Sequence, residues 1–254
     1  MENRMPVLFV GHGNPMNAIE ETPFSSEWIR LGRELPRPTA IVVVSAHWTT
    51  DGRFVTAMPR PNLIYDFYGF PKELSEVEYP VLGDPILAKR IAKLFPGTIS
   101  DFSRGLDHGA WSVLVRMFPN ADIPVVQVSL DMTKNLEEEF ELMKSLRTLR
   151  DEGVLFIGSG NVAHNLMTMR WNGGTYDWAI AFDEKIKTAV KGRDRETFLH
   201  PETLGEIARL SMPTDEHYRP LVSMLGLIDP DETLKFFNES IDIGSISMTS
   251  FITR

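Results

Sequence analysis

Residues 41–48, Ile-Val-Val-Val-Ser-Ala-His-Trp, are the stretch that most constrains the fold. Four β-branched residues follow one another without a polar break, after the turn-forming residues Pro36, Arg37 and Pro38. A short apolar run with such a boundary is typical of a central strand that is covered on both faces, as in a parallel α/β sheet. Ligands of open α/β sheets bind beyond the carboxyl ends of the strands, and His47 falls at that end. The stretch therefore predicts a buried strand that carries a histidine to a binding site.

The same design recurs elsewhere in the chain. Residues 7–10 form an apolar run that closes on Gly11-His12-Gly13, and residues 153–158 run out into Ser159-Gly160 and then His164. Flanking glycines let the backbone turn sharply and leave an imidazole unobstructed. A single histidine at a strand end is more often a hydrogen-bonded structural residue than a ligand. Several histidines with one local design favour a shared site.

Apolar runs of strand length alternate along the chain with segments of helical periodicity. The expected strands are residues 7–10, 41–48, 53–58, 124–130 and 153–158, with strands at a sheet edge in the tail, residues 234–237 and 245–251. The expected helices are residues 22–35, 85–95, a stretch up to 118 that begins near His108, 134–151 as the longest, 177–190, 201–210, and 214–225 with His217 in its first turn. This order predicts an α/β fold, with three αβα layers around a largely parallel, mixed central sheet and one catalytic domain over residues 1–254.

Charge and cysteine content narrow the class of function. A net charge of −9 over 254 residues disfavours nucleic acid as the main partner, because phosphate contacts need clustered Lys and Arg. The absence of cysteine excludes disulfides, Cys-based zinc sites and a thiol nucleophile. No apolar run approaches the length of a membrane span, and the first residues lack a basic-then-apolar signal pattern. We therefore expect a cytoplasmic protein that acts on a small soluble molecule.

The histidines are the candidates for chemistry. Five of the six lie beside turn-forming residues at the ends of expected elements, namely His12, His47, His108, His164 and His217. The sixth, His200, lies in a polar stretch and is expected at the surface. Imidazole binds Zn, Cu, Fe and Ni, and without thiolates a multi-histidine site indicates Zn(II) or non-haem Fe(II). A closed four-histidine zinc site would be structural, whereas open positions can hold water, substrate or dioxygen.

Six ordered motifs resemble the LigB-type extradiol ring-cleaving dioxygenases, in the branch similar to DOPA 4,5-dioxygenase. The resemblance covers nearly the whole chain, and the motifs together are highly specific. They are Phe-Val-Gly-His-Gly-Asn-Pro-Met at 9–16, Val-Ser-Ala-His-Trp at 44–48, Tyr-Asp-Phe-Tyr-Gly-Phe-Pro at 65–71, Gly-Leu-Asp-His-Gly-Ala-Trp at 105–111, Gly-Ser-Gly-Asn-Val-Ala-His-Asn at 158–165 and Pro-Thr-Asp-Glu-His-Tyr at 213–218.

The resemblance implies roles for individual histidines. His12, His47 and His217 would bind one divalent metal per chain, with His164 as a fourth ligand or a catalytic neighbour within reach. His108 would be the acid/base histidine, and its place at a helix start favours a neutral imidazole that can accept a proton. Relatives that cleave protocatechuate pair two histidines with a glutamate on Fe(II). Glu216 would point about 100° away from His217 on a helix, which makes it a poor substitute for that glutamate.

The resemblance also implies a reaction. A catechol such as DOPA would be opened by 4,5-cleavage to a semialdehyde, with both atoms of one dioxygen incorporated. Zinc is expected in the purified protein because an all-histidine site suits it, and Fe(II) is expected for ring cleavage because zinc has no accessible redox change. The expected partners are the catechol and dioxygen only, with no nucleic acid and no membrane. The protein would be a monomer or a small homo-oligomer.

Aromatic residues next to the motif histidines have two interpretations. Trp48, Tyr65, Phe67 and Phe70 could form a wall against which a catechol ring stacks, or they could be core residues, which is the usual role of aromatics in α/β proteins. The long loop of residues 59–80 that carries three of them favours a functional role, because long loops in compact domains are usually functional or disordered.

Two other functions fit the same histidines. A zinc hydrolase of an amide or ester would use the metal to lower the pKa of water and His108 as base, and would need no oxygen. A non-catalytic zinc-binding protein would use a closed site only to stabilise its fold. Five histidines at element ends exceed what tetrahedral zinc needs, which disfavours the structural site.

Overall fold

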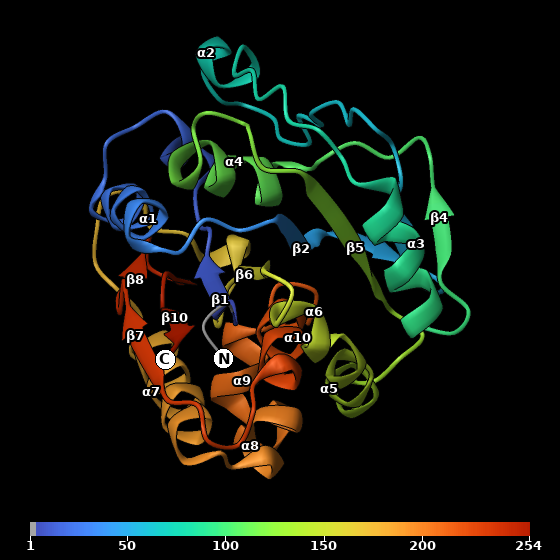
Figure 1. Ribbon diagram of the computed structural model, residues 1–254. Coiled ribbons are helices and arrows are strands. Elements are labelled where there is room, and N and C mark those ends of the chain that lie inside the picture. The colour runs from blue at the N-terminus through green and yellow to red at the C-terminus, as the bar shows by residue number, and fades with distance from the viewer. Residues whose placement is uncertain (1–3) are drawn as a thin grey trace.

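An eight-stranded mixed sheet forms the centre of the computed structural model, which describes residues 4–254 (Figure 1). The strands follow the order β4-β3-β5-β2-β6-β1-β10-β7 across the sheet. Their bounds are β1 Val7–Gly11, β2 Ala40–Thr50, β3 Phe54–Thr56, β4 Ile99–Asp101, β5 Val125–Asp131, β6 Val154–Gly160, β7 Leu234–Phe237 and β10 Ser250–Thr253. Two short strands, β8 Ile241–Asp242 and β9 Ile246–Ser247, pair separately.

The four central strands β5, β2, β6 and β1 run parallel to one another. Within the eight-stranded sheet, as described over residues 4–254, antiparallel pairing is confined to β10 with β1, β7 with β10, and β3 with β5. The predicted α/β fold with a largely parallel, mixed sheet is therefore confirmed. Because β1, β2 and β6 are parallel neighbours, their carboxyl ends meet at one edge of the sheet.

Helices cover both faces of the sheet. Helices α1 Pro23–Glu34 and α4 His108–Met117 lie on one side, and α3 Pro85–Leu94, α5 Leu136–Met143, α7 Asp177–Gly192 and α10 Arg219–Leu227 lie on the other (Figure 1). Shorter helices are α2 Lys72–Ser75, α6 Arg147–Arg150, α8 Arg195–Leu199 and α9 Glu206–Ser211, with 3₁₀ turns η1 Pro15–Ala18, η2 Lys144–Leu146, η3 Leu166–Thr168 and η4 Pro201–Leu204.

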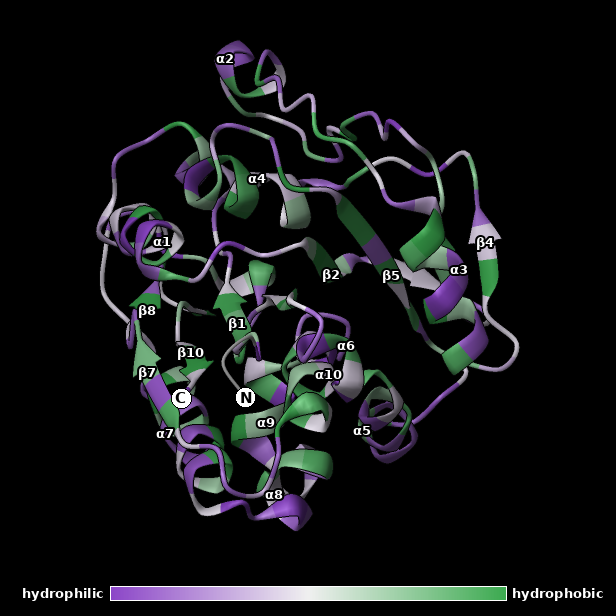
Figure 2. Ribbon diagram, viewed as in Figure 1, coloured by the Kyte–Doolittle hydropathy of each residue, from purple (hydrophilic) through white to green (hydrophobic). Residues whose placement is uncertain are grey.

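The central strands contribute side chains to two hydrophobic cores, one on each face of the sheet. In β1, Val7 and Phe9 pack into the core under α5 and α10, while Leu8 and Val10 pack into the core under α1 and α4. Successive strand side chains point to opposite faces, so a strand covered on both faces has to be apolar at every position. Figure 2 shows β1 in the hydrophobic colour accordingly. This is the physical basis of the unbroken apolar runs in the sequence.

The prediction of one continuous helix over residues 134–151 is wrong. The segment is divided into α5, η2 and α6, and the longest described helix is α7 with 16 residues. At the break, the Ser145 hydroxyl donates to the Leu142 carbonyl at 2.8 Å, and such a bond competes with the backbone ladder of the helix. Within residues 4–254, no helix combines the length and the apolar composition that crossing a membrane requires.

The predicted helix over residues 214–225 begins later than expected. Helix α10 starts at Arg219, with Pro220 in its first turn, so His217 lies in the turn before the helix and not in the helix. Proline is favoured in the first turn because its missing N–H would be unpaired there in any case. The predicted helix over residues 201–210 is interrupted as well, since Gly205 has a φ of 67° and separates η4 from α9.

A buried ion pair joins the sheet to the helices beneath it. Arg53 is 5% exposed and Glu139 in α5 is 0% exposed, and the two side chains form a salt bridge. Glu139 also accepts a 2.6 Å hydrogen bond from Ser223 in α10. Removing one partner of such a pair leaves the other charge buried without compensation.

Replacement of Glu139 with alanine is therefore expected to lower the free energy of unfolding by about 3–5 kcal/mol. Urea denaturation followed by circular dichroism measures the change. Glu137→Ala on the exposed side of the same helix is the control and should change stability by less than about 0.5 kcal/mol. Equal midpoints for the two variants would contradict a stabilising role for the pair.

Candidate metal centre

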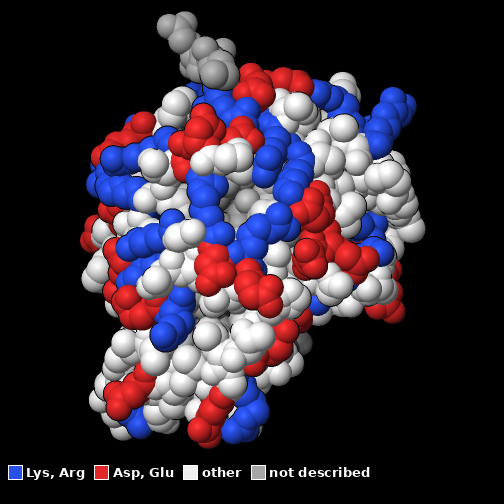
Figure 3. All heavy atoms as spheres, turned by 90° about the horizontal axis from the view of Figure 1, so that it is seen from below, with Lys and Arg blue, Asp and Glu red and all other residues white. Residues whose placement is uncertain are grey.

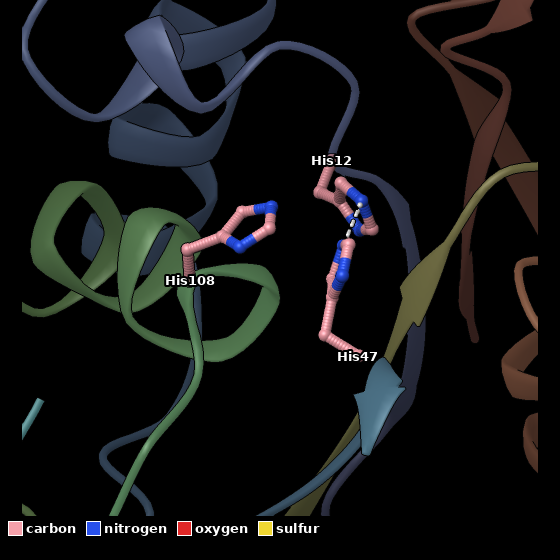
Figure 4. A group of neighbouring side chains, drawn as sticks. All are labelled: His12, His47 and His108. Atoms are coloured by element: carbon pink, nitrogen blue, oxygen red, sulfur yellow. Dashed lines mark hydrogen bonds between the residues drawn. The ribbon is translucent and has the colours of Figure 1, made fainter. Parts of the chain in front are cut away.

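Three of the candidate histidines lie at the ends of core elements. His12 follows β1, His47 lies near the end of β2, and His108 opens α4. One ring nitrogen from each lies within 4.8 Å of the others. Figure 4 shows the three imidazoles pointing toward one another from separate elements. The parallel order of the sheet brings these histidines together although they are far apart in the sequence.

The other two motif histidines lie beside this group. Ligand atoms of His164, Glu216 and His217 are within 4.8 Å of one another. The ring of His217 is centred 5.4 Å from that of His12 and 5.0 Å from that of His47. All five histidines singled out by the sequence therefore meet at one place. His200 lies apart, with its side chain 42% exposed beside Glu202, as predicted.

The spacing of His12 and His47 suits a shared metal. Their Nε2 atoms are 3.2 Å apart (Figure 4). Two nitrogens bound to one zinc-sized ion at about 2.0–2.1 Å lie about 2.9–3.4 Å apart for angles between octahedral and tetrahedral. These two rings therefore present their lone pairs at the distance that a metal ion requires.

Hydrogen bonds fix which nitrogen faces the centre. The Ser159 hydroxyl donates to the Gly109 carbonyl at 2.6 Å, so its oxygen accepts from Nδ1 of His12 at 2.9 Å. The Glu216 carboxylate accepts from Nδ1 of His217 at 3.0 Å. Each ring then carries its proton on Nδ1 and keeps a free lone pair on Nε2. Nε2 of His217 is buried and has no hydrogen-bond partner among the described residues, which fits an atom that binds a metal.

Burial keeps these imidazoles neutral. It lowers the pKa of His12 and of His217 well below the ordinary range, and neighbouring imidazoles add to the effect. Burial and then the charge of His108 lower the pKa of His47 to about 4, and burial and then His47 lower the pKa of His164 to about 4. A neutral imidazole is the form that binds a metal, so the residues present fit a divalent ion.

His108 is held by a carboxylate from the long loop. Asp66 Oδ1 accepts from the backbone N–H of His108 at 3.0 Å and lies 2.9 Å from its Nδ1. Burial raises the pKa of Asp66, but the hydrogen bonds and charge of His108 outweigh it and lower that pKa to about 2. An ionised Asp66 accepts the Nδ1 proton and leaves Nε2 of His108 facing the other rings.

His164 stacks on His217. The two rings are 3.4 Å apart between centroids and 8° from parallel. Imidazole lone pairs lie in the ring plane, so two stacked rings cannot both aim a lone pair at one ion. This arrangement favours His164 as a neighbour of the metal over a fourth ligand that binds together with His217.

Sequence reasoning missed three supporting residues. Ser159 and Asp66 lie inside quoted motifs but carry no local sign of which ring they touch. Glu216 was expected to point away from His217 on a helix, and this was wrong because the two residues precede α10. The adjacency of Glu216 and His217 outside a regular helix was the one available signal.

Aromatic side chains of the long loop form a cluster that contacts His108 through Phe67. The ring of Phe67 meets that of His108 edge to face at 5.7 Å and that of Phe70 at 5.6 Å. Tyr65 contacts Phe67 at 6.3 Å and Trp111 at 5.7 Å. Three of the four aromatic residues predicted to bind substrate therefore form one cluster beside the histidines.

Trp48 has different surroundings. It is 4% exposed, and the guanidinium of Arg104 lies 5.3 Å from its ring centre. Arg104 also donates to the carbonyl of His47 at 3.1 Å. Across residues 4–254, Trp48 forms no close ring pair with a site histidine. Its environment is that of a packed residue which supports the end of β2.

Gly160 allows His217 to approach the sheet. A Cβ atom added at Gly160 would lie 2.2 Å from the backbone oxygen of His217. Gly160→Ala is therefore expected to displace His217 and weaken metal binding by about 10–100-fold, as changes to residues that orient ligands do. Metal titration of the apoprotein measures the affinity. Gly192→Ala, where an added Cβ meets nothing within 4 Å, is the control, and equal affinities in the two variants would rule out this role.

Comparisons with known proteins match nearly the whole chain. Residues 9–250 match the family model described as the catalytic LigB subunit of aromatic ring-opening dioxygenase. The chain is 46% identical to the 4,5-DOPA dioxygenase extradiol of Escherichia coli (strain K12), covering 97% of this chain and 94% of that protein. It is 37% identical to the 4,5-DOPA dioxygenase extradiol of Beta vulgaris, over 98% and 97% of the two chains.

A solved structure has the same fold. The crystal structure of an uncharacterized protein from Escherichia coli K12 superposes with a TM-score of 0.86, at 42% sequence identity, and covers 98% of this chain and 99% of that one.

Proposed function

The chain belongs to the family of the catalytic LigB subunit of aromatic ring-opening dioxygenases, and on this premise we propose that it opens the ring of a catechol such as DOPA. The proposed reaction is 4,5-cleavage to a semialdehyde, with one dioxygen incorporated per ring. The observation that carries the proposal is the convergence of five histidines beside an aromatic cluster, with Nε2 of His12 and of His47 3.2 Å apart and Nε2 of His217 buried without a partner among the described residues.

We infer that Nε2 atoms of His12, His47 and His217 hold one divalent ion per chain. Their support is the 3.2 Å spacing of two of these atoms and the unpartnered third. When bound, a redox-active ion supplies the centre at which a catechol and dioxygen exchange electrons. Zinc has no accessible redox change, so Fe(II) is the ion proposed for turnover, and zinc is an ion that the same site would take during purification.

His108 is proposed to take a proton from a catechol hydroxyl. Because Asp66 occupies Nδ1, the proton would be accepted at Nε2, which faces the metal ligands. Asp66 would stabilise the imidazolium that results. His164, stacked on His217 and partly exposed, is proposed as a second group that can exchange protons near the reacting centre.

Phe67, Tyr65 and Phe70 are proposed to pack against the catechol ring. Their cluster excludes water from the side of His108, and an aromatic ring of the substrate can pair with them edge to face. Trp48 is proposed to act less directly, through the packing of Arg104 against the end of β2.

The test compares two metals in the same protein. Metal-free protein is loaded anaerobically with Fe(II) or with Zn(II), and oxygen uptake is measured with a panel of catechols that includes DOPA. The Fe(II) form should give a yellow product and consume one dioxygen per ring, and the Zn(II) form should consume none. The 3-O-methyl ether of DOPA, which lacks a free diol, is the control substrate and should consume none with either metal.

Two results would favour other functions. Hydrolysis of esters or amides by the zinc form, with no oxygen uptake by the Fe(II) form, would indicate a zinc hydrolase. Absence of both activities, together with unfolding on metal removal, would indicate a structural zinc protein.

A further inference from the structure

A cavity lies at the end of the molecule away from the histidines. It has a volume of about 560 Å³ and is bounded by α5, α8 and the C-terminal ends of α7 and α10. Helix α10 separates the two places, because His217 precedes its first residue and Leu225, near its last, lines the cavity. Small-molecule sites commonly measure about 300–1,000 Å³, so the volume suits an organic ligand.

The cavity is lined by an excess of positive charge. Its cations are Lys144, Arg147, Lys191, Arg193 and Arg195, and its acids are Asp231 and Glu232. The whole chain, in contrast, carries a net charge of −9. Figure 3 looks onto this end of the molecule and shows Lys and Arg side chains gathered around a hollow. A local reversal of the overall charge favours an anionic ligand.

Ion pairs within the protein neutralise only part of the positive charge of the cavity lining. Lys144 and Arg195 share Glu141, at 2.6 and 2.7 Å, and Arg147 lies 3.3 Å from Asp229. Arg195 also lies 4.0 Å from Glu137, so these three cations are paired with carboxylates, and the unpaired positive charge of the lining comes from its two remaining cations.

Two other cations have no carboxylate partner within residues 4–254. Arg193 donates only to backbone carbonyls, those of Asp229 and Glu232. Lys191 lies over the ring of Phe236, at 4.8 Å from its centre. Glu232, one of the two acids in the lining, is engaged by the buried Arg150. The ammonium of Lys191 and part of the Arg193 guanidinium are therefore available to an anion.

The floor of the cavity is apolar. Phe140, Phe198, Leu225 and Ile228 lie beneath the cations, and Arg195 and Lys144 lie 4.5 and 4.9 Å from the ring centre of Phe140. A cationic rim over an aromatic floor matches a ligand with a charged head and an apolar body. A fully hydrated ion such as inorganic phosphate would leave the floor uncovered.

We propose that this cavity binds a small organic carboxylate with an aromatic or aliphatic body. The carboxylate lies against Lys191 and Arg193, and the body rests on Phe140 and Leu225. The site is separate from the metal centre. The proposal of this binding site therefore does not depend on the proposed ring cleavage.

The test uses 1-naphthoate as the probe in calorimetric titration of the full chain, with the neutral 1-naphthamide and inorganic phosphate as comparison ligands. Naphthoate should bind at one site with a dissociation constant below about 1 mM, and the other two at least about tenfold more weakly. Lys191→Glu combined with Arg193→Gln should weaken naphthoate binding about tenfold or more. Lys185→Glu, an exposed charge reversal on α7 outside the cavity, is the matched control and should stay within about twofold.

Thermal melting of each variant establishes that it is folded. If the double variant is not folded, the single variant Lys191→Gln takes its place in the titration. Equal naphthoate affinity in the cavity and control variants would overturn the proposal. So would loss of binding in His47→Ala, because the probe would then be bound at the metal centre. Absence of saturable binding by the unaltered protein would overturn it as well.

Discussion

Replacing His12, His47 or His217 with alanine is expected to remove the bound metal and reduce ring cleavage by more than about 10³-fold, since a catalytic metal contributes several kcal/mol of transition-state stabilisation. The expectation follows from the 3.2 Å spacing of the Nε2 atoms of His12 and His47, and from Nε2 of His217, which is buried and has no hydrogen-bond partner among the described residues. Metal per chain, measured by elemental analysis, should fall from one to near zero in each variant.

His200→Ala is the matched control, because His200 is the one histidine outside the cluster and its side chain is 42% exposed. It should keep both metal and turnover. Full metal retention in any two of the three ligand variants would show that the ligand set is a different one, such as His12, His47 and His108, whose ring nitrogens also lie within 4.8 Å of one another.

Replacing His108 with alanine or glutamine is expected to reduce turnover by about 10²–10⁴-fold while the metal stays bound, which is the usual effect of losing a general acid/base. The expectation follows from Asp66, which occupies Nδ1 of His108 and leaves its Nε2 free beside the rings of His12 and His47. Turnover and metal content are measured on the same preparation, so that loss of the metal cannot be mistaken for loss of the base.

Two variants of Asp66 provide a second test of the role of His108. Asp66→Asn keeps an oxygen that accepts from Nδ1 and from the backbone N–H of His108, whereas Asp66→Ala keeps neither contact. If Asp66 acts by positioning His108, the asparagine variant should retain more turnover than the alanine variant, with KM little changed in both. Metal lost from His108→Ala would make His108 a ligand, and near-normal turnover would return it to a buried structural role.

The competing functions lose support for different reasons. A closed zinc site of His12, His47, His164 and His217 is disfavoured, because His164 stacks face to face on His217 and the two rings cannot both aim a lone pair at one ion. A hydrolase could use the same three ligands, so geometry alone does not separate it from a dioxygenase. Family membership does, because the match covers residues 9–250 and contains all five histidines.

Local sequence determined the fold class and the list of candidate histidines. Strands such as β1 have to be apolar at every position because both faces are covered, and this leaves an unbroken run that can be recognised without any tertiary information. His12, His47, His108 and His164 were recognisable because they follow such runs or lie near glycines that allow a turn, whereas His217 was recognised by its place in the first turn of an expected helix. His200 could be set aside because its neighbours are polar.

Only the tertiary structure decided which groups support each ring. Ser159 and His12 are 147 residues apart, and they meet because β6 and β1 are parallel neighbours. The strand order that brings them together depends on long-range packing of helices against both faces of the sheet, which no local pattern encodes. The roles of Asp66 and Glu216 likewise depended on the path of a long loop and on where α10 begins. Sequence patterns report the chemistry a segment can offer, whereas distances of about 3 Å between side chains are set by the packing of the whole chain.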